Sequence, residues 1–280
     1  MGAPVPLACL RFGRGPALVF LHGLFGSGRN WRGFARPFAD RWTCLLPDLR
    51  AHGDSPHARP VDYPAMAGDV AALLEREGFA EAVLVGHSMG GKTAMMLALS
   101  RPWLVRRLIV LDIAPVRYAD HDHRPLIRAL RALDLARVRH RRDADRALAA
   151  AVPDPALRAF LLQNLVLDDR GARWRLDLAA LEDHMPDLLD FPVPAGAAPY
   201  PGPTLFVRGD RSDYVRDAHR PAIARLFPRA RVATLAGAGH WLHVTHPREL
   251  AATLAVFLGE SARARVRGPS GTAPPRSRGR

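Results

Sequence analysis

Cysteine is scarce in this sequence, and long apolar runs are missing. The two cysteines, Cys9 and Cys44, cannot form a disulfide framework, and they suit a reducing compartment. No apolar segment approaches the roughly 20 residues that a membrane-spanning helix requires. The first fifteen residues, MGAPVPLACLRFGRG, lack the basic and apolar regions of a signal peptide. We therefore predict a cytoplasmic protein without a membrane span.

Lysine is almost absent, since Lys92 is the only one and all the other basic residues are arginine. The formal net charge of +13 would suggest a nucleic-acid partner. The skew toward arginine, alanine, glycine and proline is, however, more typical of GC-rich codons than of a binding surface. The segment 261–280 carries arginines and no acidic residue, and it is rich in Pro, Gly and Ser. We predict that 261–280 is a disordered, solvated tail and that the protein binds no nucleic acid.

Short apolar segments alternate with helical patterns along most of the chain. This alternation predicts an α/β fold, with a mostly parallel central sheet flanked by helices. The predicted strands are 17–22, 43–48, 82–86, 107–112, 204–209 and 230–235. The predicted helices are 28–40, 63–78, 90–101, 217–226 and 247–259.

The alternation is interrupted between Asp112 and Thr204, where helical patterns occur without a convincing strand. This segment ends in the proline-rich connector FPVPAGAAPYPGP. Because α/β folds bind ligands outside the carboxyl ends of their strands, an insertion at this point is suited to cover a site. We predict a core formed by 1–114 and 202–260, and a helical cap with its connector at 115–201.

The segment VGHSMGGKTAMML matches two motifs at once. Residues 86–90 read G-x-S-x-G, the nucleophile elbow of a serine hydrolase. Residues 86–93 read G-x-x-x-x-G-K-T, the P-loop of nucleotide-binding proteins. Both motifs join a strand to a helix, so the local pattern does not decide between a hydrolase and a nucleotide-binding protein.

The rest of the chain favours the hydrolase. A serine hydrolase needs a nucleophile, a base, an orienting acid and N–H donors for the oxyanion. Ser88 in the elbow and His240 in the later segment GAGHWLH occur in the order expected. Gly23 in LHGLFGSG permits a tight turn that directs the N–H of Leu24 at the site. The N–H of Met89, at the start of the next helix, is the second expected donor.

These motifs resemble those of the α/β-hydrolase superfamily, and in particular of YbfF-type esterases and thioesterases, relatives of the mitochondrial abhydrolase-domain hydrolases. The matching segments are LHGLFGS, PDLRAHGDSPH, YPAMAGDV, VGHSMGGKTAM, VLDIAPVRY and FPRARVATLAGAGHWLH. The resemblance implies an α/β-hydrolase fold, with Ser88 as nucleophile and His240 as base. It also implies esters or acyl thioesters as substrates, and neither a metal nor an organic cofactor.

Two carboxylates are candidates for the acid of the triad. Many superfamily members place it three residues after the glycine that ends a late strand. Counted from Gly209, that position holds Ser212, with Asp213 beside it. The YbfF-type pattern implies Asp112 instead. Because neighbouring strand ends converge on one site, either carboxylate could orient His240, and we favour Asp112 over Asp213.

Other histidines and arginines have plainer explanations than a metal or phosphate site. Histidines at 240, 243 and 246 would spread across a helix face, which suits a single metal ion poorly. His22, directly before Gly23, is expected to fix the oxyanion turn by hydrogen bonding. Arginines at 124, 128 and 131 share one predicted helix face, as a solvated surface or as a contact for an acidic substrate.

We therefore expect a serine hydrolase that cleaves a small-molecule acyl ester or thioester. A C–C bond hydrolase with the same triad remains an alternative, as does a P-loop nucleotide-binding protein. Acyl-chain length, leaving group and oligomeric state are not indicated by any pattern in the sequence.

Overall fold

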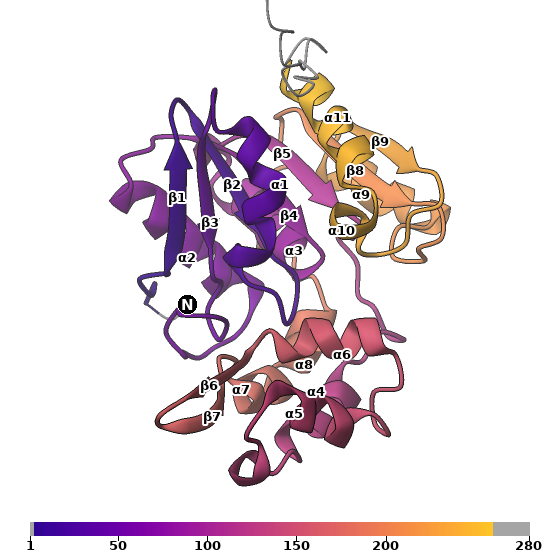
Figure 1. Cartoon of the computed structure of the whole chain (residues 1–280). Coiled ribbons are helices and arrows are strands. Elements are labelled where there is room, and N and C mark those ends of the chain that lie inside the picture. Colours follow the sequence, from indigo (N-terminus) through magenta and orange to yellow (C-terminus); the bar gives the residue numbers. More distant parts are fainter. Residues whose placement is uncertain (1–2, 260–280) are drawn as a thin grey trace, which may run out of the picture.

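The computed structural model describes residues 3–259 (Figure 1). The segment 261–280, for which we predict disorder, lies outside the described residues. In the described part of the chain, one sheet has seven strands in the order β1-β3-β2-β4-β5-β8-β9. Within that sheet every pairing is parallel except that of β1 with β3. The strands are β1 (Cys9–Gly13), β2 (Ala17–Leu21), β3 (Thr43–Pro47), β4 (Ala82–His87), β5 (Val105–Leu111), β8 (Thr204–Gly209) and β9 (Ala230–Leu235).

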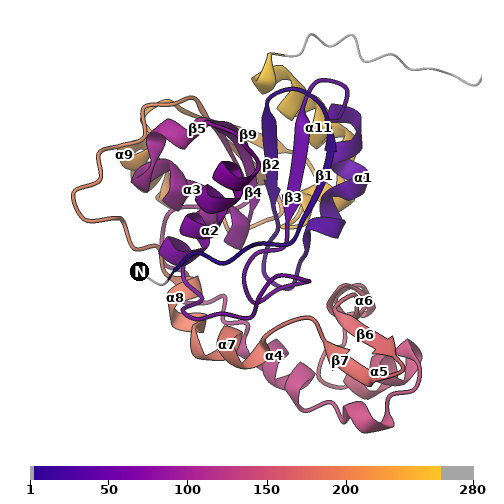
Figure 2. The same ribbon diagram turned by 90° about the vertical axis from the view of Figure 1, so that its left-hand side faces the viewer.

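Helices cover both faces of the sheet (Figures 1 and 2). Side chains alternate along a strand, so Val19 and Leu21 of β2 join one apolar cluster while Leu18 and Phe20 join the other. The first cluster is closed by α2 (Tyr63–Arg76), α3 (Met89–Ser100) and α9 (Arg220–Leu226). The second is closed by α1 (Arg32–Ala35), α10 (Leu242–Thr245) and α11 (Pro247–Leu258). The mostly parallel sheet flanked by helices is thus confirmed.

The helices of residues 115–201, here called the insertion, lie beyond the carboxyl ends of the parallel strands, and the connector after them returns beside the sheet to β8 (Figures 1 and 2). The insertion contains α4 (Arg124–Arg131), α5 (Arg141–Leu148), α6 (Pro155–Leu162), α7 (Leu178–Asp183) and α8 (Met185–Leu189). None of the helices in residues 3–259 is long and apolar enough to cross a bilayer.

The insertion is not wholly helical, and that part of the prediction was wrong. A hairpin of β6 (Leu165–Asp168) and β7 (Gly171–Trp174) follows α6. The Asp168 carboxylate accepts from the Arg170 N–H, and Gly171 takes a φ of 95°, so a two-residue turn connects the strands. Each strand has only four residues, too few to show a period of two against the helical pattern before it.

Candidate active site

Ser88 occupies a strained turn between β4 and α3. Its φ of 51° and ψ of −118° are unfavourable for a residue with a side chain. A Cβ on Gly86 would lie 2.2 Å from the Gly90 carbonyl oxygen, and one on Gly90 would lie 2.4 Å from the Leu21 carbonyl oxygen. The turn therefore requires both glycines of the G-x-S-x-G motif, and it holds Ser88 partly exposed at the carboxyl edge of the sheet.

Asp112 follows β5, and its side chain contacts His240. His240 Nδ1 lies 2.8 Å from Asp112 Oδ2. The Gly209 N–H donates to Oδ1 at 3.1 Å, and the Ser212 hydroxyl donates to Oδ2. These partners satisfy a carboxylate that is 0% exposed. A proton on His240 Nδ1 leaves Nε2 without one, which is the tautomer that a general base needs.

Asp213, the other candidate acid, faces a different histidine. Its side chain is 68% exposed, and Oδ1 lies 3.3 Å from His121 Nε2. No hydrogen bond in residues 3–259 joins Asp213 to His240. The structure therefore brings Asp112, and not Asp213, to His240, while Ser212 at the alternative position donates to Asp112.

Two further side chains hold His240, and no sequence motif pointed to either contact. The Tyr214 ring stacks on the His240 ring with centroids 3.9 Å apart and an interplanar angle of 18°. His87 Nε2 lies 2.9 Å from the His240 carbonyl oxygen. Burial lowers the pKa of His87 well below its usual value, so the ring is neutral and donates one N–H. The imidazole is thus fixed through its ring face and its backbone.

The loop after β2 passes close to Ser88. A Cβ on Gly23 would lie 3.3 Å from Ser88 Cβ and 2.9 Å from His87 Nδ1, so only glycine allows this approach. His22 supports the loop, since its Nε2 accepts from the Leu49 N–H at 2.9 Å and its Nδ1 donates to the Gly23 carbonyl at 2.8 Å. Burial lowers the pKa of His22 to about 4, which keeps the ring neutral in this bridge.

The N–H of Leu24 lies in the loop after β2, and that of Met89 lies at the start of α3, directly after Ser88. Both residues line the same pocket as Ser88. Within residues 3–259, neither N–H donates a hydrogen bond to a protein acceptor. The Ser88 hydroxyl also makes no hydrogen bond in that range, to His240 or to any other residue, and catalytic hydrogen bonds often tighten only when substrate binds.

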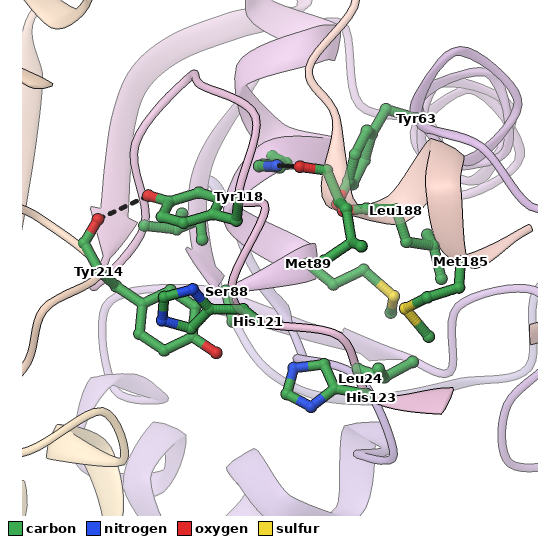
Figure 3. A pocket seen from close by; sticks show the side chains of 13 residues that line it. Leu24, Tyr63, Ser88, Met89, Tyr118, His121, His123, Met185, Leu188 and Tyr214 are labelled. Carbon is green, nitrogen blue, oxygen red and sulfur yellow. Dashed lines mark hydrogen bonds between the residues drawn. The ribbon is translucent and has the colours of Figure 1, made fainter. Parts of the chain in front are cut away.

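The pocket lies between the sheet and the insertion (Figure 3). Met89 of the core faces Met185 of α8, with Leu24 and Leu188 nearby. Its cavity volume is about 40 Å³, so a longer acyl chain fits only if side chains that line the pocket move. The lining is mainly apolar and aromatic, as expected for binding an acyl group.

Basic residues considered for phosphate binding already have protein partners. Lys92 is 1% exposed and donates to two backbone carbonyls of the insertion. The P-loop interpretation requires this ammonium to face a phosphate site, and it faces these carbonyls instead. Arg128 and Arg131 both pair with Glu182.

Comparison with protein families agrees with this geometry. A model of the alpha/beta hydrolase fold family matches residues 16–247. The chain belongs to this family. The match covers the nucleophile elbow and the His240 segment together, and it decides between the two interpretations of residues 86–93 in favour of the hydrolase.

Individual relatives of this hydrolase are esterases and lipases. It is 44% identical over 250 residues to the mouse (Mus musculus) sn-1-specific diacylglycerol lipase ABHD11, covering 87% of this chain and 81% of the mouse protein. It is 32% identical over 244 residues to esterase YbfF of Escherichia coli (strain K12), covering 87% and 93% of the two chains. The solved structure of a marine microorganism esterase matches with a TM-score of 0.87 and 34% identity, covering 90% of this chain and 99% of that esterase. The resemblance to YbfF-type esterases is confirmed, and these relatives support ester hydrolysis.

Proposed function

We propose that this protein is a serine esterase in which Ser88, His240 and Asp112 form the catalytic triad. The observation that carries the proposal is the hydrogen bond between His240 and the fully buried Asp112. A buried carboxylate that orients the imidazole and stabilises its protonated form is what a serine nucleophile requires of its base. The strained turn at Ser88 gives independent support, because such strain is concentrated at reactive positions.

Each group has one task in the proposed reaction. Ser88 Oγ attacks the acyl carbonyl while His240 Nε2 takes its proton, and Asp112 stabilises the imidazolium. The N–H groups of Leu24 and Met89 donate to the oxyanion of the tetrahedral intermediate. His240 then gives its proton to the leaving alcohol, so that an acyl-enzyme remains on Ser88. Water, deprotonated by the same imidazole, releases the acid and restores the serine.

The proposed substrate is a carboxylic ester with an apolar acyl group. The lining by Met89, Met185 and Leu188 favours such a group over a charged one. The name of the mouse relative, a diacylglycerol lipase, makes acylglycerols the first natural esters to try. The same groups would cleave an acyl thioester, with a thiol as the leaving group. The insertion is the proposed cap, and no metal or organic cofactor takes part.

Hydrolysis of p-nitrophenyl esters, from acetate to laurate, tests this proposal. We expect wild-type turnover, and a loss of about 10⁴-fold or more in kcat for Ser88→Ala, because the nucleophile is removed. Ser100→Ala, at the exposed end of the same helix, is the matched control and should keep wild-type rates. Turnover by Ser88→Ala at the rate of Ser100→Ala would refute the proposal.

A further inference from the structure

Lys92 lies one turn after Ser88 on α3, and its ammonium group is inside the protein. Its backbone N–H donates to the Ser88 carbonyl at 3.0 Å, so the two residues share the first turn of the helix. Its Nζ donates to the carbonyl oxygens of Leu189 at 3.0 Å and Asp190 at 2.8 Å. The ammonium therefore connects the helix of the proposed nucleophile directly to the end of α8.

Tyr63 of α2 makes a similar contact beside it. Its hydroxyl donates to the Leu188 carbonyl at 2.5 Å, and its side chain is buried. Three consecutive carbonyls, those of residues 188–190, thus accept from Tyr63 and Lys92. The last carbonyls of a helix have no partners within it, and they carry partial negative charge that favours a cation. Two core side chains therefore hold the end of α8.

The surroundings make Lys92 a costly residue to bury. Its Nζ lies 4.8 Å from the ring centroid of Tyr118 and 5.4 Å from that of Tyr63. Burial lowers the pKa of Lys92 to about 7, against the opposing effect of the Asp190 carboxylate. A methionine would fill similar space without this desolvation cost. The position is therefore better explained by the bonds of the ammonium than by packing.

α8 forms one wall of the pocket that contains Ser88. Met185 and Leu188 of α8 face Met89 across the pocket (Figure 3). Because the cavity volume is only about 40 Å³, a small shift of α8 changes which acyl chains fit. The contacts that fix the end of α8 therefore also fix the size of the pocket.

We propose that Lys92 and Tyr63 form a clamp on residues 188–190 that holds α8 in place and thereby sets which acyl-chain lengths reach Ser88. This inference rests on the proposed ester hydrolysis. Lys92 and Tyr63 also line the pocket, but we assign them as positioning residues, since their proposed action is through α8 and not on the reacting atoms. Loosening the clamp lets α8 move away from the pocket, so that chains that the wild type rejects are accepted.

The test compares Tyr63→Phe and Lys92→Met with Tyr200→Phe. Tyr200 is a matched control, because it is equally buried and its hydroxyl also donates to a backbone carbonyl, that of Val105 at 2.7 Å. Tyr63→Phe removes one hydroxyl and keeps the ring, so it provides a variant that folds if Lys92→Met does not. Two measurements are made on each protein: amide hydrogen exchange of residues 185–191, and kcat and KM for p-nitrophenyl esters of increasing chain length.

We expect exchange of residues 185–191 to quicken in both clamp variants and to stay at the wild-type rate in Tyr200→Phe. The kcat/KM for the preferred ester, divided by that for the longer esters, should fall about fivefold in Tyr63→Phe and further in Lys92→Met. Most of this change should be in KM and less of it in kcat. A chain-length profile like that of Tyr200→Phe in both clamp variants would overturn the inference. If the wild type cleaves no ester, the proposed function fails instead, and unchanged exchange of residues 185–191 would overturn the clamp separately.

Discussion

Different interactions stabilise the sheet and the insertion. All six residues of β4 are buried, and the Arg50–Asp69 ion pair of the core is buried as well. In the insertion, the ion pair between Arg173 and Asp168 leaves those side chains 53% and 39% exposed. Exposed pairs stabilise weakly, about 0–1 kcal/mol each. Apolar residues of the insertion, such as Leu161 and Met185, pack into the same cluster as the sheet, and the hydrogen bonds of Lys92 add a specific attachment.

This difference places the proposed reaction and the proposed substrate selectivity in different parts of the molecule. The proposed nucleophile and acid directly follow β4 and β5, and the proposed base lies in the loop after β9. One wall of the proposed acyl pocket comes from the insertion, which can shift when its attachments are loosened. Substitutions at the sheet edge should therefore change the rate, and substitutions at the attachments should change selectivity. The predictions below test that division.

The largest effect is expected at the sheet edge, for Asp112→Asn. An amide neither fixes the required tautomer of His240 nor stabilises its imidazolium, so kcat should fall about 10³- to 10⁴-fold. Asp213→Asn is the matched control, and because that side chain is exposed and bonded to His121, its kcat should stay within about twofold of wild type. Ester hydrolysis at saturating substrate measures both. The opposite ranking would assign the acid to Asp213.

An intermediate effect is expected for the ring that stacks on His240. Tyr214→Leu removes the aromatic face that stabilises the imidazolium, and kcat should fall about tenfold. Tyr214→Phe keeps the face and should keep most of the activity. The two variants are compared by kcat on a short ester, to limit effects on the acyl pocket. Equal losses in both would indicate that the hydroxyl, and not the ring face, is what matters.

The smallest effect concerns the attachment of the insertion and its dependence on pH. Burial lowers the pKa of Lys92 from 10.5 to about 7, so between these values the unfolded chain binds more protons than the folded one. Lys92 therefore makes stability rise with pH across that window. The titratable groups packed against the ammonium are the Asp190 carboxylate and the side chains of Tyr63 and Tyr118, whose ring faces it contacts. Burial raises the pKa values of both tyrosines further above 10, so they do not titrate in the folded protein below pH 9.

Thermal unfolding of wild type and Lys92→Met, from pH 6.5 to 9, tests whether Lys92 makes stability rise with pH. The difference in Tm between them should move in favour of wild type by about 3 °C or more as the pH rises. Other groups, including the two cysteines, are common to both proteins and cancel in the difference. Parallel curves would mean that Lys92 does not change its charge in the folded protein within this range.

The strands inside the sheet were predictable, and so was one of its two edge strands. Predicted strands 43–48 and 204–209 match β3 and β8, because runs of buried apolar residues mark a strand with neighbours on both faces. The edge strand β9 was predicted at 230–235, although only its last residue is buried. β1, with no fully buried residue, has no such run and was missed. The hairpin of the insertion was missed for a related reason, since its strands are short and half exposed.

Sequence order suggested Ser88 and His240 as partners, but the contacts around them depend on tertiary structure. Which of Asp112 and Asp213 meets His240 is decided by how two loops pack at the strand ends, and no local pattern records that. The hydrogen bonds of Lys92 could not be predicted for the same reason. It lies inside a recognisable motif, yet its partners are nearly one hundred residues away, and backbone carbonyls leave no trace in a sequence.

The most direct test of the central claim is to find the atom that attacks. The protein is treated with a fluorophosphonate, and the tryptic peptide 77–92 is sequenced by mass spectrometry. The account predicts one phosphonyl group on Ser88, with loss of ester turnover in the same proportion. Loss of turnover with the adduct on another residue, or full turnover with Ser88 modified, would contradict it.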